Sequence, residues 1–129
     1  MLAFLALVAM LNYGVGWAGG LFGVALTLEV ILGWTLAPVA FLIGVPSVEI
    51  LSFGSLIGTK VILNEFVAYL NLAGLIADGA LQTKTIVMST FALCGFANLS
   101  SIAIQIGGIG PLAPSRVGDL AKLGLKAVL

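Results

Sequence analysis

Apolar residues fill most of this chain, and a few polar positions divide it into segments. The first charged residue is Glu29, so residues 1–28 form one apolar stretch, with glycines in its second half. A membrane-spanning helix needs about 20 residues, and residues 1–13 are too few on their own. We expect residues 1–13 to be the end of a spanning helix; an anchor that resembles a signal sequence is the alternative. The glycines of residues 14–20, beside Tyr13 and Trp17, predict a loop at the membrane surface.

The second apolar segment, residues 26–43, has features that shorten a helix. Glu29 lies near its start, and Pro38 lacks the backbone donor that a continuous helix uses. We predict one or two short helices along the membrane interface, with a kink or a stop near Ala37. A plain spanning helix is the alternative.

The third segment, residues 46–78, has a polar interruption between two apolar halves. Residues 48–57 and 61–76 flank the polar residues 58–60, and each half is shorter than a full span. Two short helices that meet at a polar tip predict a re-entrant hairpin. Membranes tolerate such a hairpin where the tip is buried in protein or faces water.

Glu65 follows the tip of this hairpin. A carboxylate at bilayer depth costs about 2.5–3.5 kcal/mol on insertion scales, so it needs a functional or an ionic partner. Lys60 is the candidate for an ionic partner, although a spacing of five residues does not favour the pair on one helix face. A broken tip would allow it.

Residues 82–110 contain a second polar interruption, from Cys94 to Ser101, within a long uncharged run. Unpaired amides and hydroxyls in an apolar medium cost several kcal/mol, so Asn98, Ser100 and Ser101 need partners. We predict a broken helix whose break packs against the tip of the hairpin between Gly58 and Glu65. The alternative is a continuous helix whose polar groups bond to a neighbouring helix.

The last segment combines glycines, prolines and cations. The glycines of residues 107–110 indicate a linker, and Ser115 is a candidate N-cap for a helix over residues 115–129. Arg116, Lys122 and Lys126 place this part on the cytoplasmic side.

Composition fixes the class of protein. Hydrophobic residues make up 61% of the chain and charged residues 8%, with no net charge and a mean hydropathy of +1.27. These values predict an all-α integral membrane protein. The chain has no histidine and a single cysteine, Cys94, and it has no cationic cluster. Nucleic acid is therefore excluded as a partner, and so are His/Cys metal sites, disulfides and Cys-His or Ser-His catalysis.

Two motifs carry a family resemblance. One covers residues 58–69, GTKVILNEFVAY, and the other covers residues 92–102, ALCGFANLSSI, and continues through residues 105–108 and 112–114. Together they closely resemble the C-terminal part of the concentrative nucleoside transporters. The resemblance implies a multi-pass symporter of the inner (plasma) membrane that couples nucleoside uptake to sodium or protons. It also implies a homotrimer surrounded by membrane lipid, without a cofactor other than the coupling ion.

The resemblance further implies an arrangement for the segments. The chain would be the second of two inverted repeats: the end of a scaffold helix (residues 1–13), an interfacial part (26–43), a re-entrant hairpin (46–78), a broken helix (82–110) and the start of the last transmembrane helix (115–129). The hairpin of the first repeat, which in the family carries base-recognising groups and the cation ligands, has no counterpart in this sequence. We therefore expect a fragment of a longer transporter.

The resemblance assigns site residues position by position. Glu65, Asn98 and Ser101 match the family's ribose-binding groups, and Phe96 matches an aromatic residue beside the base. A carboxylate, an amide and a hydroxyl can bond ribose hydroxyls with direction, and an aromatic ring can contact a planar base. The chain would then supply the ribose-binding half of the site. A structural or interaction subunit is the alternative, whereas an enzyme is disfavoured because the chain lacks a set of base, nucleophile and metal.

Overall fold

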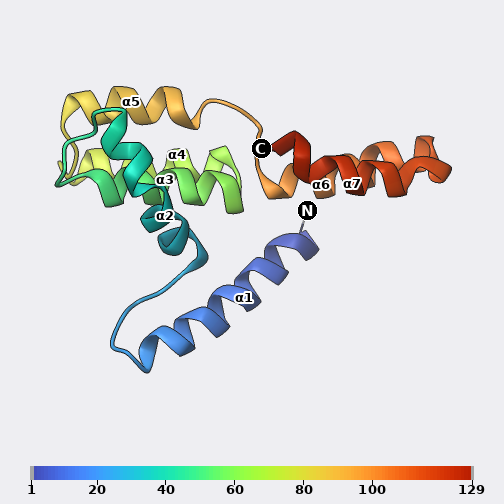
Figure 1. Cartoon of the computed structure of the whole chain (residues 1–129), viewed down its shortest axis with the longest axis horizontal. Coiled ribbons are helices and arrows are strands. Elements are labelled where there is room, and N and C mark those ends of the chain that lie inside the picture. Colours follow the sequence, from blue (N-terminus) through green and yellow to red (C-terminus); the bar gives the residue numbers. More distant parts are fainter. Residues whose placement is uncertain (1, 129) are drawn as a thin grey trace.

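The computed structural model describes residues 2–128, and within this range the chain is helical without any strand. In order, the elements are α1 (Leu2–Gly20), α2 (Leu28–Leu42), α3 (Ile50–Ile62), α4 (Glu65–Ala77), α5 (Thr83–Leu93), α6 (Leu99–Ile109), the 3-10 turns η1 (Gly110–Leu112) and η2 (Pro114–Arg116), and α7 (Val117–Val128). Figure 1 shows α2 to α5 grouped together, with α1 leading away from the group and α6 and α7 side by side beyond it. The all-helical prediction is confirmed.

The first helix is longer than the sequence predicted. It continues through residues 14–20 to Gly20, so the predicted loop at these positions is wrong. A glycine costs a helix interior about 1 kcal/mol, but an apolar helix that unwinds also exposes backbone groups, which favours continuation. The chain turns later, at Gly23, whose φ is 68°. With 19 residues, α1 is the one described helix that is long and apolar enough to cross a membrane.

The second helix runs through its proline. α2 is continuous from Leu28 to Leu42 with Pro38 inside it. The helix therefore does not stop near Ala37, where the sequence predicted a kink or a stop. Pro38 is exposed, and so is Trp34, whose carbonyl loses its helical partner at this proline. Thr27 caps the start of α2, since its side chain accepts a hydrogen bond from Val30 N at 3.3 Å.

Glycines let α2 and α3 lie very close together. A Cβ built on Gly33 would lie 2.9 Å from Ser55 N, and one built on Gly54 would lie 2.5 Å from Gly33 O. A Cβ on Gly58 would collide with the carbonyl oxygen of Glu29. Small residues of this kind allow the backbones of membrane helices to approach.

The helical hairpin exists, and its break lies within the predicted tip between Gly58 and Glu65 but after the polar residues 58–60. α3 continues through residues 58–60, and the interruption falls at Leu63 and Asn64. The Thr59 hydroxyl is satisfied within α3, since it donates to Ser55 O at 2.9 Å. Asn64 starts α4, since its Oδ1 accepts a hydrogen bond from Val67 N at 2.9 Å. The glycine at position 58 therefore serves packing against α2 and does not mark the break.

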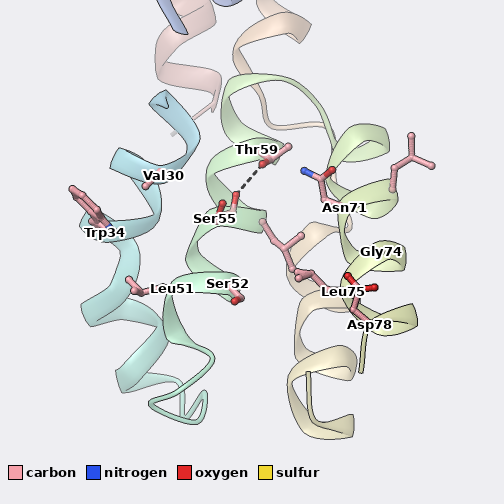
Figure 2. Close-up of a pocket in the computed structure, with 12 residues that line it drawn as sticks. Val30, Trp34, Leu51, Ser52, Ser55, Thr59, Asn71, Gly74, Leu75 and Asp78 are labelled. Carbon is pink, nitrogen blue, oxygen red and sulfur yellow. Dashed lines mark hydrogen bonds between the residues drawn. The ribbon is translucent and has the colours of Figure 1, made fainter. Parts of the chain in front are cut away.

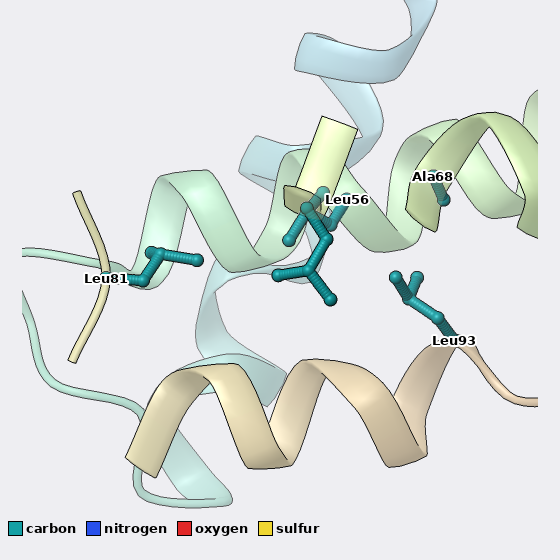
Figure 3. Close-up of a cluster of buried hydrophobic side chains, with 5 residues drawn as sticks. Leu56, Ala68, Leu81 and Leu93 are labelled. Atoms are coloured by element: carbon teal, nitrogen blue, oxygen red, sulfur yellow. The ribbon is translucent and has the colours of Figure 1, made fainter. Parts of the chain in front are cut away.

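The second interruption is a break between two helices, as the sequence predicted. α5 ends at Leu93, and α6 begins at Leu99. A buried cluster of apolar side chains holds the end of α5 against the hairpin (Figure 3), and its members are Leu56, Ala68, Leu72, Leu81 and Leu93. The hairpin and the broken helix are thus packed into one unit.

The C-terminal part differs from the prediction in two details. Residues 107–109 belong to α6, so they are not a linker. Ser115 lies in η2, and α7 begins at Val117, so Ser115 is not the N-cap of that helix. Gly124 of α7 packs against α6, where a Cβ would lie 2.6 Å from Ile102 Cγ2.

Candidate substrate-binding site

Glu65 and Asn98 meet between the two interruptions. Asn98 Nδ2 donates a hydrogen bond to Glu65 Oε2 at 3.1 Å, across 33 residues of sequence. Glu65 is the first residue of α4, and Asn98 is the N-cap of α6. Both groups therefore lie at helix N-termini, where the helix dipole favours negative charge. The predicted packing of the hairpin tip against the break is confirmed by this contact.

The amide of Asn98 is held by several groups. Its Oδ1 accepts hydrogen bonds from Ser100 Oγ and from Ser101 N, both at 2.7 Å. Its backbone oxygen accepts a hydrogen bond from Ser101 Oγ at 2.7 Å. These bonds fix which side of the amide carries its donor, so Nδ2 points to Glu65. Asn98 is 2% exposed, which keeps water from competing for the bonds.

The predicted residues are only partly brought together. Glu65, Asn98 and Ser101 form one hydrogen-bonded group, and Glu65 and Ser101 stay partly accessible. Phe96 lies on the unwound segment two residues before Asn98, and its side chain is 79% exposed. Phe96 is thus adjacent to the group in the chain but free to contact something outside it.

Two residues that support the site, Ser100 and Asn64, are not among the predicted site residues. Ser100 is 1% exposed, and its hydroxyl donates to Asn98 Oδ1. Ser100 therefore holds the Asn98 amide in place and is not itself accessible. Asn64 plays for α4 the part that Asn98 plays for α6, because each asparagine caps the helix that follows a break. The sequence carried a signal for each: an asparagine before an apolar helical run is an N-cap pattern, and a serine hydroxyl in an apolar run needs a partner.

The ion pair between Lys60 and Glu65 does not form. Within residues 2–128 the one salt bridge joins Arg116 and Asp119. Glu65 instead bonds to Asn98, and the Lys60 ammonium lies near Gly95, 3.9 Å from the position that a Cβ on Gly95 would take. The two charges at the hairpin tip therefore have separate surroundings.

A cavity of about 640 Å³ lies apart from this group, between α2, α3 and α4. Figure 2 shows Ser52, Ser55 and Thr59 of α3 on one wall, with the hydrogen bond from Thr59 to Ser55 running along that helix. Asn71 of α4 and Asp78, which follows α4, lie on the other wall. None of the predicted site residues lines this cavity. The candidate site is therefore the hydrogen-bonded group at the two breaks.

Paired helix breaks that present polar side chains and free helix ends to each other are the organisation of secondary transporters. Comparison with known proteins gives the family. Residues 1–129 match the family model described as "Na+ dependent nucleoside transporter C-terminus". The chain belongs to the concentrative nucleoside transporter family.

Individual relatives agree with this assignment. The chain is 58% identical to a protein of Bacillus subtilis named "Uncharacterized transporter YutK" and 45% identical to "Nucleoside permease NupC" of Helicobacter pylori; each match covers 100% of this chain and 32% of the relative. A solved structure, "Structure of CNTnw in an inward-facing substrate-bound state", matches with a TM-score of 0.78 and 51% identity, over 98% of this chain and 32% of that one. The chain thus spans about a third of the length of the relatives that it matches.

Proposed function

We propose that this chain supplies the ribose-binding half of a nucleoside site in a cation-coupled nucleoside symporter. The observation that carries the proposal is the hydrogen bond from Asn98 Nδ2 to Glu65 Oε2. This bond brings the Glu65 carboxylate close to the Ser101 hydroxyl at a partly accessible position, and both groups can still accept hydrogen bonds. Ribose hydroxyls, which both donate and accept, are suited to such a set.

The roles within the site follow from each group's chemistry. Glu65 Oε1 accepts from a sugar hydroxyl, while Oε2 stays bonded to Asn98. Ser101 Oγ accepts from a second hydroxyl while it donates to Asn98 O. Phe96, which is exposed, contacts the planar base through a face or an edge. Asn98 orients Glu65 and Ser101 through its hydrogen bonds, and Ser100 in turn holds the Asn98 amide.

The setting of the site is part of the same proposal. The family model is described as Na+ dependent, and the relatives include a protein named as a nucleoside permease. We propose uptake of nucleosides with sodium or protons across the plasma membrane by a homotrimer. The hairpin would be re-entrant, and α2 would lie along the membrane interface.

The test measures uridine binding by calorimetry on the native protein that contains this chain, purified in detergent. Glu65→Gln keeps the shape but removes a charge-assisted bond, which should cost about 1.5–3 kcal/mol, or roughly 10- to 100-fold in affinity. Because 2′-deoxyuridine lacks a ribose hydroxyl, it should lose less on this substitution if Glu65 accepts from that hydroxyl.

Glu29→Gln is the matched control. Glu29 is also bonded by an asparagine, Asn12 Nδ2, at 3.0 Å to each carboxylate oxygen, but it lies between α1 and α2. The Glu29→Gln variant should bind uridine with the affinity of the native protein. Unchanged affinity in Glu65→Gln, or equal losses in both glutamate variants, would contradict the proposal.

A further inference from the structure

Lys60 is a charged residue of the hairpin that the proposed site does not use. It lies in the last turn of α3, one turn after Leu56, and Leu56 packs in the same buried cluster as Leu93 at the end of α5 (Figure 3). This placement brings the Lys60 ammonium to the start of the unwound segment, beside Gly95. Lys60 is half-buried, and within residues 2–128 its ammonium forms no salt bridge and no side-chain hydrogen bond.

The C-termini of α3 and α5 both lie near the Lys60 ammonium. The last carbonyls of a helix have no partner within it, and together they carry about half a negative charge. At the end of α5, Thr90 O accepts from Tyr69 Oη at 2.7 Å and Phe91 O accepts from Cys94 N at 3.2 Å. The next carbonyls, of residues 92 and 93, have no partner within the described chain, and neither do those of residues 60–62 at the end of α3.

The two charged residues at the breaks, Glu65 and Lys60, therefore lie at helix ends of opposite polarity. Glu65 lies at the two helix N-termini, those of α4 and α6, and Lys60 lies at the two C-termini, those of α3 and α5. Each charge has the sign that the adjoining helix ends favour. A direct ion pair between Lys60 and Glu65 would give up both interactions, which accounts for its absence.

We propose that the Lys60 ammonium is the resident cation of this break. In transporters, half-helix C-termini and unwound carbonyls coordinate a monovalent cation. Here the Lys60 ammonium supplies the positive charge beside these helix ends without a hydrogen bond to them, so this half of the site holds its shape without a metal ion. Lys60 is thus a positioning residue: it stabilises residues 94–98, and these present Asn98 to Glu65. The inference rests on the proposed function only for its effect on nucleoside binding.

The first experiment follows hydrogen exchange of the peptide that covers residues 94–101 in the native protein in detergent. The amide of Ser101 lies in this peptide and is protected by its bond to Asn98 Oδ1. Lys60→Met keeps the apolar bulk and removes the charge, and it should speed exchange about 2- to 30-fold, the range expected for a charge at a helix end. Lys60→Arg should exchange as the native protein does.

Lys84→Met is the matched control, because the Lys84 ammonium bonds to Gly44 O at 2.6 Å, at the other end of α5. It should leave the exchange of residues 94–101 unchanged. Native exchange in Lys60→Met would overturn the proposal.

The second experiment asks whether a small cation replaces the missing ammonium. Lys60→Ala leaves room at the break, so sodium or ethylammonium should restore slow exchange, whereas tetramethylammonium at equal ionic strength should not. The native protein in the same salts gives the reference. Equal responses to all three cations would show that the side chain acts through packing alone, and would overturn the proposal.

Uridine affinity separates this inference from the proposed function. If both hold, Lys60→Ala loses affinity and small cations restore it along with slow exchange. If the native protein binds no nucleoside but the exchange results are as expected, the inference stands and the proposed function fails. If uridine binds and Glu65→Gln weakens it while Lys60→Met changes neither exchange nor affinity, the proposed function stands and the inference fails.

Discussion

Asn98 reaches Glu65 from the N-cap position of α6, and its own amide oxygen caps that helix at the same time. Nδ2 donates to Glu65 Oε2 at 3.1 Å, while Oδ1 accepts from Ser101 N at 2.7 Å. One side chain therefore couples the geometry of the break to the hairpin. A change at Asn98 should affect both local helix formation and the site.

Asn98→Ala should destabilise the protein more than the loss of an ordinary cap does. The lost cap costs about 0.5–2 kcal/mol, and leaving the buried Ser100 hydroxyl without its acceptor adds about 1–3 kcal/mol. Equilibrium unfolding in detergent measures the sum. Asn71→Ala is the control, since Asn71 is exposed on α4, and it should change stability by less than about 0.5 kcal/mol. Equal effects of the two substitutions would contradict the assigned role of Asn98.

The close approach of α2 and α3 predicts opposite outcomes for two glycines. In Gly58→Ala the new methyl group would meet the carbonyl of Glu29, and overpacking of this kind costs about 1–3 kcal/mol. In Gly74→Ala, inside α4, the methyl group would meet nothing within 4 Å, so the better helix propensity of alanine should stabilise the protein by up to about 1 kcal/mol. Thermal unfolding of both variants checks the pair. A destabilised Gly74→Ala beside a neutral Gly58→Ala would refute this packing.

The meeting of Glu65 and Asn98 could be predicted from the sequence because it follows from a general cost. Polar groups inside two apolar segments need partners, and each interruption is the other's nearest source of them. The same reasoning predicted a broken helix interrupted from Cys94 to Ser101, and the structure confirms a break, which lies between Leu93 and Leu99. The family motifs added the assignment of roles, which the experiments above address.

The position of the hairpin break could not be read in the same way. Residues 58–60 have the composition of a break, yet Gly58 is there because α2 passes close by, and Thr59 bonds back to its own helix. The first reason is a contact between two helices, and the second depends on the rotamer of one side chain, so neither can be read from local composition. Asn64 marked the break through its capping pattern, which composition alone does not single out.

Long-range hydrogen bonds at the base of the hairpin were also beyond the sequence. Glu49 precedes α3 and is 5% exposed, and its Oε1 accepts a hydrogen bond from Gln82 N at 3.0 Å. Gln82 is the N-cap of α5 and makes no side-chain cap of its own. Glu49 therefore supplies the cap of α5 from another element, and its negative charge lies at a helix N-terminus.

This arrangement predicts how α5 responds to changes at Glu49. Glu49→Ala removes the acceptor, so the first turn of α5 should fray and the amides of residues 82–86 should exchange faster, by about 5- to 150-fold for a loss of 1–3 kcal/mol. Glu49→Gln keeps an acceptor oxygen and should lose only the charge at the helix end, about 0.3–1 kcal/mol. Hydrogen exchange by mass spectrometry distinguishes the two, with residues 65–77 of α4 as the internal reference. If Glu49→Ala left residues 82–86 protected, the bond to Gln82 would be incidental, and α5 would be held by its buried apolar face alone.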